Sequence, residues 1–327
     1  MSVRIINGDC REALTALPDE SVHCCVTSPP YFGLRDYGVE GQMGLEPTPD
    51  EFVAGMVAVF REVRRVLRED GTLWLNIGDT YNNNPSTSDI PRAEQGNGSG
   101  AFQIPGEKHV QANRAKPNKA QPLIEAGIKK KDLIGIPWML AFALRADGWY
   151  LRQDIIWSKP NPMPESVQDR CTKAHEYLFL LSKGPRYYYD TAAIAEKATG
   201  EAPGNTKATK GGRAYGEGAA EHRTAANLHN IGARETRNKR SVWEVATQPF
   251  KEAHFATFPP ALVEPCILAG CPRGGTVLDP FFGAGTTGLV ADRLQRNCIG
   301  IELNPEYAAI ADRRINADAG MFADVAA

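Results

Sequence analysis

The sequence has 327 residues, of which 42% are hydrophobic and 23% are charged, and its formal net charge is −2. This composition is typical of a globular protein with a large core, and the small net charge leaves only local basic patches for contact with nucleic acid. The sequence shows no apolar run near the roughly 18 residues of a membrane span, no signal peptide and no C-x-x-C pair among its seven cysteines, so we expect a cytoplasmic protein without a metal site.

The first eighty residues alternate strands and helices as α/β proteins do. Apolar runs at 4–7, 22–28 and 72–77 predict three short strands. Between the second and the third, apolar residues recur at helical spacing after Asp50, a predicted N-cap, and Gly71 is predicted to end that helix. A strand–helix–strand order implies parallel pairing with a right-handed crossover, so we expect a doubly wound, mostly parallel sheet.

The second predicted strand runs into Thr27-Ser28-Pro29-Pro30-Tyr31. Two consecutive prolines stop the hydrogen-bond ladder of a sheet because neither has an N–H. The chain is therefore expected to leave the sheet in an extended form, with outward carbonyl groups and an aromatic ring directly after them. Such carbonyls accept hydrogen bonds from an amino group and such a ring stacks on a flat heterocycle, which suits the exocyclic amine of a nucleobase. The same residues are equally compatible with a strand end followed by a packing tyrosine.

Three polar segments interrupt the predicted fold. Residues 33–38 form a glycine-flanked loop with Arg35, either a lid over a bound base or an ordinary surface loop. Residues 82–131 form a long polar insertion. Residues 191–240 contain nine basic and five acidic residues, which makes this insert either a candidate target-recognition segment or a solvated linker. The basic residues in its last part are Arg234, Arg237, Lys239 and Arg240.

The middle of the chain predicts a helix at 133–146 and strands at 150–157 and 177–182. The two strands are joined by a stiff polar loop that begins at Lys159 and contains three prolines. Because no helix lies between them, we expect an antiparallel hairpin at the edge of the sheet.

A nucleotide-binding signal lies near the end of the chain. Residues 276–278 predict a strand, and Gly283-Ala284-Gly285-Thr286-Thr287-Gly288 opens the helix after it, the context that a G-x-G-x-x-G motif requires. The next predicted strand, 298–303, contains Glu302, nineteen residues beyond the first glycine, where an acid accepts the ribose hydroxyls of an adenosine. The motif therefore predicts an adenosine-type cofactor. Residues 317–327 are predicted to form a flexible tail.

Only one strand and one helix follow the glycine motif, so the N-terminal half has to complete the sheet. If the first strand lies beside the last, then Asp9, Asp279, Glu302 and the Pro-Pro corner meet at the carboxyl ends of the strands. Open α/β sheets bind their ligands at that edge. We therefore expect a single domain of residues 1–327 with one site.

The sequence resembles a known family in the order of its motifs. Ser-Pro-Pro-Tyr at 28–31 and Asp-Pro-Phe-Phe-Gly-Ala-Gly-Thr-Thr at 279–287 resemble the S-adenosylmethionine-dependent DNA amino-methyltransferases of the β arrangement, in which the catalytic half precedes the cofactor half. The resemblance covers roughly residues 3–81, 133–190 and 241–316. It implies a Rossmann-like methyltransferase fold with a circularly permuted motif order.

The resemblance also implies roles for particular residues. The methionine part of the cofactor would be held by Asp279, Pro280, Phe281, Gly283, Gly285, Thr286 and Thr287. Glu302 would hold the ribose, Asp9 would face the adenine, and Phe258 and Pro259 would close the cofactor pocket from the other side. The flipped base would be held by Ser28, Pro29, Pro30 and Tyr31. Contacts with DNA would come from Arg35, Lys159 and the basic residues of the 191–240 insert.

The implied reaction transfers a methyl group from S-adenosylmethionine to N6 of adenine or N4 of cytosine in duplex DNA, with the two bases left open. The amine would donate hydrogen bonds to Ser28 and to the Pro29 carbonyl, and Tyr31 would stack on the extruded base. The implied partners are double-stranded DNA, a second copy of the chain, and a cognate restriction enzyme unless the methyltransferase is an orphan.

Three other functions are compatible with parts of the sequence. Methylation at carbon 5 of cytosine needs a cysteine nucleophile, for which Cys266 is the candidate, although it lies in a predicted helix away from the other motifs. An RNA methyltransferase or a protein-glutamine methyltransferase shares the Pro-Pro-aromatic corner but leaves the basic inserts unexplained. A protein that only binds a ligand would not need both the cofactor motif and the Pro-Pro corner, and the sequence contains both.

Overall fold

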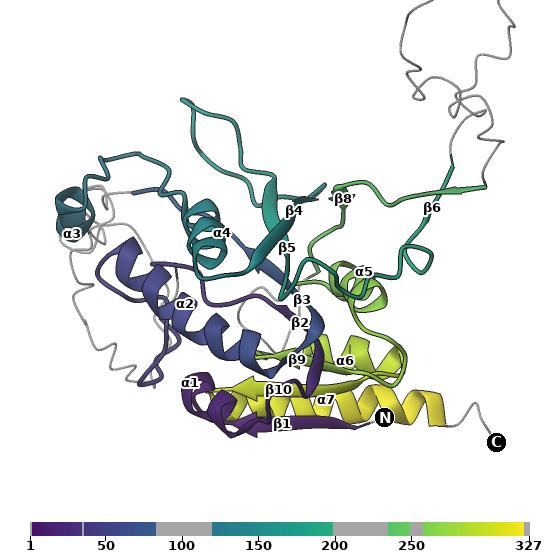
Figure 1. Cartoon of the computed structure of the whole chain (residues 1–327). Coiled ribbons are helices and arrows are strands. Elements are labelled where there is room, and N and C mark those ends of the chain that lie inside the picture. Colours follow the sequence, from purple (N-terminus) through teal and green to yellow (C-terminus); the bar gives the residue numbers. More distant parts are fainter. Residues whose placement is uncertain (1, 35, 83–119, 199–234, 249–257, 324–327) are drawn as a thin grey trace, which may run out of the picture.

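The protein is an α/β domain built on one large sheet (Figure 1). The computed structural model describes residues 2–34, 36–82, 120–198, 235–248 and 258–323. In these residues the strands of the sheet follow the order β1-β10-β9-β2-β3-β5-β4-β8. Their bounds are Val3–Asn7 (β1), Asn297–Glu302 (β10), Thr276–Asp279 (β9), Val22–Thr27 (β2), Leu67–Ile77 (β3), His175–Ser182 (β5), Tyr150–Ser158 (β4) and Val242–Glu244 (β8).

The two ends of the chain complete the sheet together. Strand β1 pairs with β10 in parallel, with Val3 opposite Cys298 and Asn7 opposite Glu302. Strands β10, β9, β2 and β3 continue the parallel part. Strand β5 is antiparallel to both β3 and β4, as the sequence predicts for the 150–182 region. The sheet is therefore mostly parallel with an antiparallel pair, and the first strand lies beside the last.

The hairpin β4–β5 is not the edge of the sheet, contrary to the sequence-based expectation. Strand β8 pairs with β4 in parallel, Trp243 opposite Trp157, and forms the outer strand on this side. It lies directly after the polar insert and is only three residues long, too short for a periodic pattern. The Trp157 indole donates to the Val245 carbonyl at 2.7 Å, which fixes this short strand against the hairpin.

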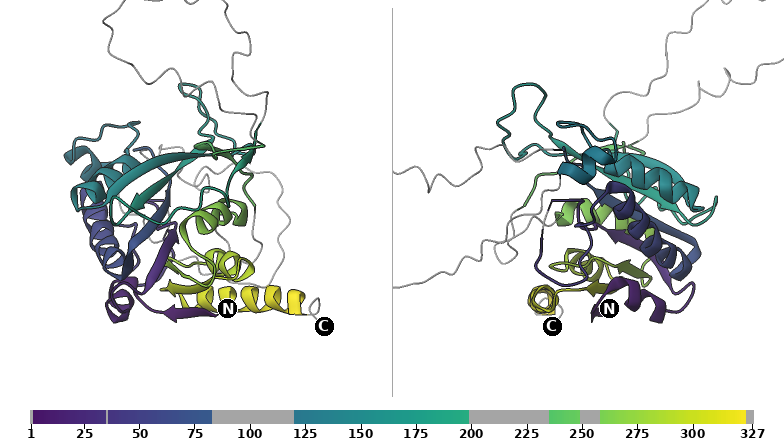
Figure 2. Two further views of the ribbon diagram at one scale, coloured as in Figure 1. Left: turned by 45° about the vertical axis from the view of Figure 1, so that its right-hand side comes forward. Right: turned by 90° about the vertical axis from the view of Figure 1, so that its left-hand side faces the viewer.

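Helices cover both faces of the sheet, so it is doubly wound (Figures 1 and 2). On one face lie α1 (Cys10–Ala13), α2 (Pro49–Val66) and α4 (Ile136–Ala146), and on the other α5 (Pro260–Gly270), α6 (Thr286–Arg293) and α7 (Pro305–Ala323). Side chains of β3 alternate between the two cores: Leu73 and Leu75 belong to the first and Trp74 to the second. This alternation follows from the period of two along a strand.

Helix α2 starts and ends earlier than the sequence suggests. Its N-cap is Thr48 and not Asp50: the Thr48 hydroxyl accepts the Glu51 N–H at 3.3 Å and donates to the Glu51 carboxylate at 2.9 Å, a capping box with Pro49 in the first turn. The helix ends at Val66 and not at Gly71, because Leu67 is already extended and pairs with Val22 of β2.

Two other predicted boundaries also move. Helix α4 begins at Ile136, three residues late, because Gly135 has a φ of +86° and the Asp79 carboxylate at the end of β3 accepts the N–H groups of Gly135 and Ile136. Helix α7 continues to Ala323 through most of the segment predicted as a tail. The Asp318 carboxylate of α7 accepts a hydrogen bond from Arg293 Nε at 2.7 Å, which ties this turn to α6. Residues 324–327 lie outside the described part.

The structure describes the parts of the two predicted inserts that adjoin the sheet. In the 82–131 insertion, Asn82 is buried, its side chain donates to the Ile128 carbonyl at 2.8 Å, and a short helix, α3 (Ala120–Glu125), precedes the return to the sheet. In the 191–240 insert, β6 (Glu196–Lys197) and β7 (Thr236–Arg237) form an antiparallel pair. Residues 83–119 and 199–234 lie outside the described part. Helices within the described ranges are all too short or too polar to cross a membrane.

Candidate active site

A cavity of about 790 Å³ lies at the carboxyl ends of the parallel strands. It is a volume that suits a small organic ligand. Both sequence motifs reach it: Ser28, Pro29, Pro30 and Tyr31 line one end, and Pro280, Phe281, Gly283 and Thr286 line the other. Asp9, Phe258 and Glu302 line it as well. The order of the strands predicts that Asp9, Glu302 and the Pro-Pro corner meet at this edge of the sheet, and all of them line the cavity.

Backbone geometry shapes the end of the cavity beside the glycine motif (Gly8–Cys10, Pro280–Ala284, Thr286 and Ile301–Asn304), which we name the cofactor end after the role expected for it from the sequence. Gly283 and Gly285 have φ values of +53° and +77°, in the left-handed region that favours glycine. A Cβ on Gly285 would lie 2.7 Å from the Ala311 Cβ of α7. The turn therefore lets α6 begin at Thr286 with its first N–H groups close to the cavity.

Glu302 braces this turn. Its Oε2 accepts the Gly283 N–H at 2.7 Å and its Oε1 accepts the Asn304 N–H at 2.8 Å. Burial raises the pKa of the Glu302 carboxyl above its usual range, against the effect of these two hydrogen bonds. The acid predicted to hold a ribose thus also holds the glycine turn in place.

Asp279 lies beneath the turn and does not line the cavity. Its carboxylate accepts the hydroxyls of Thr27 and Thr287, each at 2.6 Å, and the Phe281 N–H at 3.1 Å. Burial raises its pKa to about 6, although all three hydrogen bonds oppose the shift. Asp279 therefore ties β2, β9 and α6 together. Thr287, Gly285 and Pro259 are buried as well and do not line the cavity.

Asp9 reaches the cavity with its carboxylate already engaged. It caps α1 by accepting the Arg11 N–H at 2.8 Å, and it forms an ion pair with the Arg11 guanidinium. The hydrogen bond from the Arg11 side chain lowers the pKa of Asp9. Arg11 also donates to the Gly41 carbonyl at 3.0 Å, so the pair links the cofactor end to the 33–44 loop.

A network of side chains shapes the opposite end (Ser28–Tyr31, Asn76, Trp157, Lys159 and Glu176), which we name the base end after the role expected for the Pro-Pro corner from the sequence. The Ser28 hydroxyl donates to the Asn76 side-chain oxygen at 3.3 Å, and the Asn76 amide nitrogen donates to the Tyr177 carbonyl at 3.1 Å. The Tyr31 hydroxyl donates to Glu176 Oε2 at 2.5 Å. The Tyr31 ring rests on Gly78, where an added Cβ would lie 2.5 Å from a ring carbon.

Asn76 and Glu176 did not stand out in the sequence. Asn76 is 1% exposed within the apolar strand β3, and a polar residue inside a buried strand is the signal that points to it. Glu176 is the second residue of β5 and carries no motif.

Lys159 lies in the cavity wall, although the sequence suggested a contact with DNA. Its ammonium group forms an ion pair with Glu176 and lies 4.3 Å from the centre of the Trp157 ring, and its side chain is only 17% exposed. It is held inward because the carboxylate of Glu176, on the neighbouring strand, faces the same cavity.

Three described basic residues of the 191–240 insert, Arg237, Lys239 and Arg240, gather around the acid Glu196, and we call these four residues the Glu196 cluster. The Glu196 carboxylate lies 3.3 Å from Arg237 Nε, 4.0 Å from Lys239 Nζ and 3.0 Å from Arg240 Nε. Glu196 belongs to β6 and Arg237 to β7, and the other two residues follow β7. Three cations on one carboxylate leave a local positive charge, and the Arg240 side chain is 68% exposed. Arg35 and Arg234, also predicted to contact DNA, lie outside the described residues.

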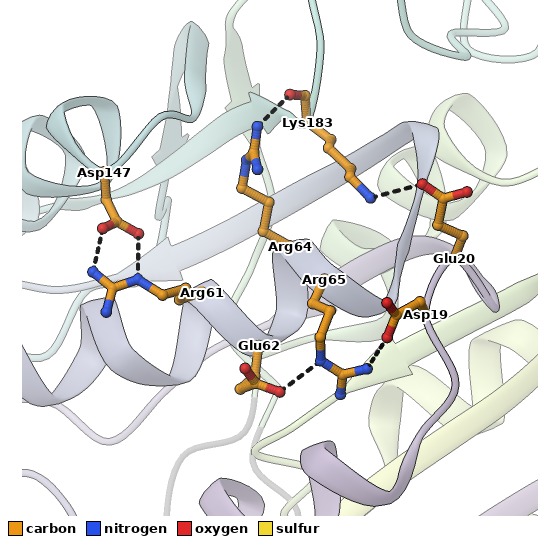
Figure 3. Close-up of a pocket in the computed structure, with 8 residues that line it drawn as sticks. All are labelled: Asp19, Glu20, Arg61, Glu62, Arg64, Arg65, Asp147 and Lys183. Carbon is orange, nitrogen blue, oxygen red and sulfur yellow. Dashed lines mark hydrogen bonds and ion pairs between the residues drawn. The ribbon is translucent and has the colours of Figure 1, made fainter.

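A second hollow lies at the other end of the sheet, beside the start of β2 (Figure 3). Arg61 pairs with Asp147, Arg65 with Asp19 and Glu62, and Lys183 with Glu20, while Arg64 donates to the Lys183 carbonyl. Four cations face four acids there, so the hollow has no net charge to attract a phosphate. The arginines of α2 are therefore engaged with residues of the protein itself, and we give them no role with DNA.

Cys266 does not take part in the site. It lies in α5, 1% exposed, and its thiol donates to the Leu262 carbonyl at 3.2 Å. Burial raises the pKa of the thiol, which disfavours the thiolate that a nucleophile needs. The cysteine-dependent route to carbon 5 of cytosine is therefore excluded for this residue.

A mostly parallel sheet with a glycine turn, an acid after the next strand and a Pro-Pro-aromatic corner in one cavity defines a Rossmann-like methyltransferase. The family model N6_N4_Mtase, described as DNA methylase, matches residues 22–313. The chain belongs to this family and is a DNA methyltransferase. The RNA and protein-glutamine alternatives gain no support from this assignment.

Type II methyltransferases match most of the length of this chain. The Type II methyltransferase M.SmaI from Serratia marcescens is 46% identical over 314 residues, which cover 96% of this chain and 91% of that protein. The solved structure of the cytosine-N4-specific PvuII DNA methyltransferase superposes with a TM-score of 0.59 at 19% identity, over 95% of this chain and 85% of that one. A putative DNA modification methylase from Thermus thermophilus, solved in complex with S-adenosyl-L-methionine, gives a TM-score of 0.56 at 23% identity, over 97% and 94%. The two structures support the fold.

Proposed function

We propose that this DNA methyltransferase takes its methyl group from S-adenosylmethionine and transfers it to the exocyclic amine of a base, N6 of adenine or N4 of cytosine, flipped out of duplex DNA. The observation that carries the proposal is that one cavity joins the glycine turn and Glu302 to the Ser28–Tyr31 corner. A methyl donor at the first end and an amine at the second would then face each other without an intervening wall.

The residues of the cofactor end fit an adenosine-type methyl donor. The left-handed glycine turn brings the start of α6 to the cavity, and Glu302 is the last residue of the next strand, where such an acid accepts ribose hydroxyls. The Thermus thermophilus methylase, which has the same fold, holds S-adenosyl-L-methionine in its complex. Bound at the cofactor end, this compound supplies an electrophilic methyl group on a sulfonium.

The base end fits an amino group. The hydroxyl hydrogen of Ser28 is donated to Asn76, so the oxygen lone pairs of Ser28 stay available as acceptors. Together with the Pro29 carbonyl they accept the two N–H groups of an amine, which favours a pyramidal nitrogen with a free lone pair. Aromatic stacking is worth roughly 1–3 kcal/mol per base and offsets much of the few kcal/mol that flipping costs. The Tyr31 ring supplies the aromatic surface.

The DNA would approach over the mouth of this cavity. The Glu196 cluster, with its excess of positive charge, would contact the phosphate backbone, because such contacts position a protein on DNA without reading its sequence. The relatives are named Type II methyltransferases, so we further propose that a restriction endonuclease of the same specificity accompanies this enzyme. A homodimer is a further proposal, made by analogy with the family.

The test is expression in a bacterial host that lacks DNA methylation, followed by sequencing that detects modified bases and by mass spectrometry of the nucleosides. We expect one short motif to carry a methylated amine at nearly every genomic copy, and the nucleoside mass spectrum to distinguish N4-methylcytosine from N6-methyladenine. A Tyr31→Ala variant expressed at the same level is the matched control. An unmodified genome in the presence of soluble wild-type protein would contradict the proposal.

A further inference from the structure

The carboxylate of Glu176 is placed to receive a proton at the base end of the cavity. Its side chain is 15% exposed and lines the same wall as Ser28 and Tyr31. Glu176 Oε2 accepts the Tyr31 hydroxyl at 2.5 Å and the Asn76 amide nitrogen at 3.3 Å, and Oε1 pairs with the Lys159 ammonium group. Glu176 Oε2 is thus connected to the base end of the cavity through the Tyr31 hydroxyl.

The other polar groups that line the cavity cannot accept this proton. The Ser28 hydroxyl donates to an amide oxygen of Asn76, which does not take up a proton, so a path through Ser28 ends there. Lys159, as an ammonium, has no lone pair to offer. The other two carboxylates that line the described cavity, Asp9 and Glu302, belong to the cofactor end, where they hold Arg11 and the N–H groups of Gly283 and Asn304.

We infer that Tyr31 and Glu176 form the route by which the target amine loses its proton while it is methylated. As the nitrogen lone pair forms the bond to the methyl carbon, the carbon–sulfur bond breaks and its electron pair goes to sulfur, leaving a neutral thioether. One N–H bond breaks and its pair returns to nitrogen. This N–H group is the one that Ser28 accepts. It lies beside Tyr31 Oη, because the Ser28 and Tyr31 hydroxyls lie 3.3 and 3.2 Å from the same Asn76 oxygen, and it turns to Tyr31 as the nitrogen becomes tetrahedral. Its proton binds to Tyr31 Oη, while the proton of the Tyr31 hydroxyl passes to Glu176 Oε2. The products are a neutral methylated amine, an intact tyrosine and a protonated Glu176, which later releases its proton to water.

This inference rests on the proposed function and adds to it an acceptor for the proton. It also gives Lys159 a purpose inside the cavity, since its ion pair holds one carboxylate oxygen and turns the other toward Tyr31. General-base assistance of this kind contributes about 10²- to 10⁴-fold to a rate.

The first test is Glu176→Gln, measured as the rate of a single turnover with enzyme in excess over a duplex that holds one target site. Glutamine has nearly the shape of glutamate, and its single side-chain oxygen still accepts a hydrogen bond from either Tyr31 or Lys159, but it cannot take up the proton. We expect a loss of about 10²-fold or more. Affinity for S-adenosylmethionine and base flipping, followed by 2-aminopurine fluorescence at the target position, should stay within about twofold of wild type.

Two further measurements separate a proton route from a merely structural role. Tyr31→Phe keeps the ring and removes the hydroxyl, so Tyr31→Phe combined with Glu176→Gln should be no slower than the slower single variant, because both act on one chain of transfer. The wild-type single-turnover rate should fall in heavy water, and this isotope effect should vanish in Glu176→Gln. Glu165→Gln is the matched control: Glu165 pairs with Arg170 at 2.6 Å in the same β4–β5 hairpin and does not line the cavity, so its rate and isotope effect should equal those of wild type.

Each other outcome overturns the inference. A Glu176→Gln variant at the wild-type rate means that Glu176 takes no proton. An equal loss of flipping and methylation, or an unchanged isotope effect, means that Glu176 only holds the wall of the cavity. Failure of the proposed function looks different, since the wild-type enzyme itself would then transfer no methyl group to the duplex.

Discussion

The two ends of the cavity are built in different ways. The cofactor end is formed largely by one continuous unit, β9–α6–β10, in which Asp279, Gly283 and Glu302 are held by backbone N–H groups and buried hydroxyls. The base end joins side chains from segments that lie far apart in the chain: Ser28, Tyr31, Asn76, Lys159 and Glu176. One end is therefore local and made by the backbone, and the other is distant and made by side chains.

This difference separates binding from chemistry. A turn fixed by glycine conformations and by two hydrogen bonds to a carboxylate keeps its shape when side chains at the other end change. A network of five side chains instead depends on each of its members, because removing one leaves a buried partner unpaired. Changes at the base end should therefore stop methyl transfer while the cofactor still binds, and changes at the cofactor end should weaken binding or the fold.

The largest effect is expected for Tyr31→Ala. The variant loses both the stacking surface and the hydroxyl that donates to Glu176, so we expect methyl transfer to fall by roughly 10³-fold or more. Affinity for S-adenosylmethionine, measured by calorimetry, should change less than about twofold. An equal loss of binding and transfer would show that the two ends are not independent.

The next effect concerns stability, at Asp279. Its pKa of about 6 in the folded protein lies above the ordinary value of 3.8, so the folded state binds this proton more tightly than the unfolded chain does. The stability that this group contributes is fully present below pH 4 and is lost as the pH rises through 6. The difference of about two pKa units corresponds to a free energy on the order of 3 kcal/mol.

Asp279→Asn removes this titration, which allows a measurement by urea unfolding at several pH values. The free energy of unfolding of wild type, relative to the variant, should decrease between pH 4 and pH 6 and then level off. A difference between the two proteins that stays constant over this range would show that Asp279 has an ordinary pKa.

A smaller effect is expected for Glu302→Ala. Hydrogen bonds to a charged group contribute roughly 1.5–3 kcal/mol, and this carboxylate holds the Gly283 turn as well as facing the cavity. We expect the affinity for S-adenosylmethionine to fall by about 10- to 100-fold in calorimetry. Glu306→Ala, an exposed acid in the first turn of α7, is the control and should bind like wild type. Unchanged binding by Glu302→Ala would remove this residue from the cofactor site.

The smallest effect concerns DNA affinity. Arg240→Gln should make the dependence of log K on log salt shallower by up to about 0.9, the value for one lost phosphate contact. Glu196→Gln should make it steeper, because it removes the carboxylate that pairs with the cations of the cluster. Arg61→Gln is a matched control, since Arg61 is similarly exposed and ion-paired but lies in the neutral hollow of Figure 3. Equal slopes for Arg240→Gln and Arg61→Gln would take the Glu196 cluster out of the interface.

The comparison of the two ends also explains what could be predicted from the sequence. The glycine turn, Glu302 and the Pro-Pro corner are local patterns, because a turn conformation or a stopped ladder depends on neighbouring residues. We expected the first strand to pair with the last because too few strands follow the glycine motif to complete the sheet. The pairing of Val3 with Cys298 confirms this expectation. Boundaries set by distant groups moved, as at Gly135, whose N–H is accepted by Asp79.

The sequence by itself determined the class of fold, the order of the two motifs and the edge of the sheet where they meet. Only the tertiary structure decided which polar side chains face each other there: Tyr31 meets Glu176 across 145 positions of the chain, Lys159 turns inward, and Asp279 sits behind the wall. The physical reason is that a buried polar group takes whichever partner the packing of strands brings within hydrogen-bond distance, and that partner leaves no periodic trace in the sequence.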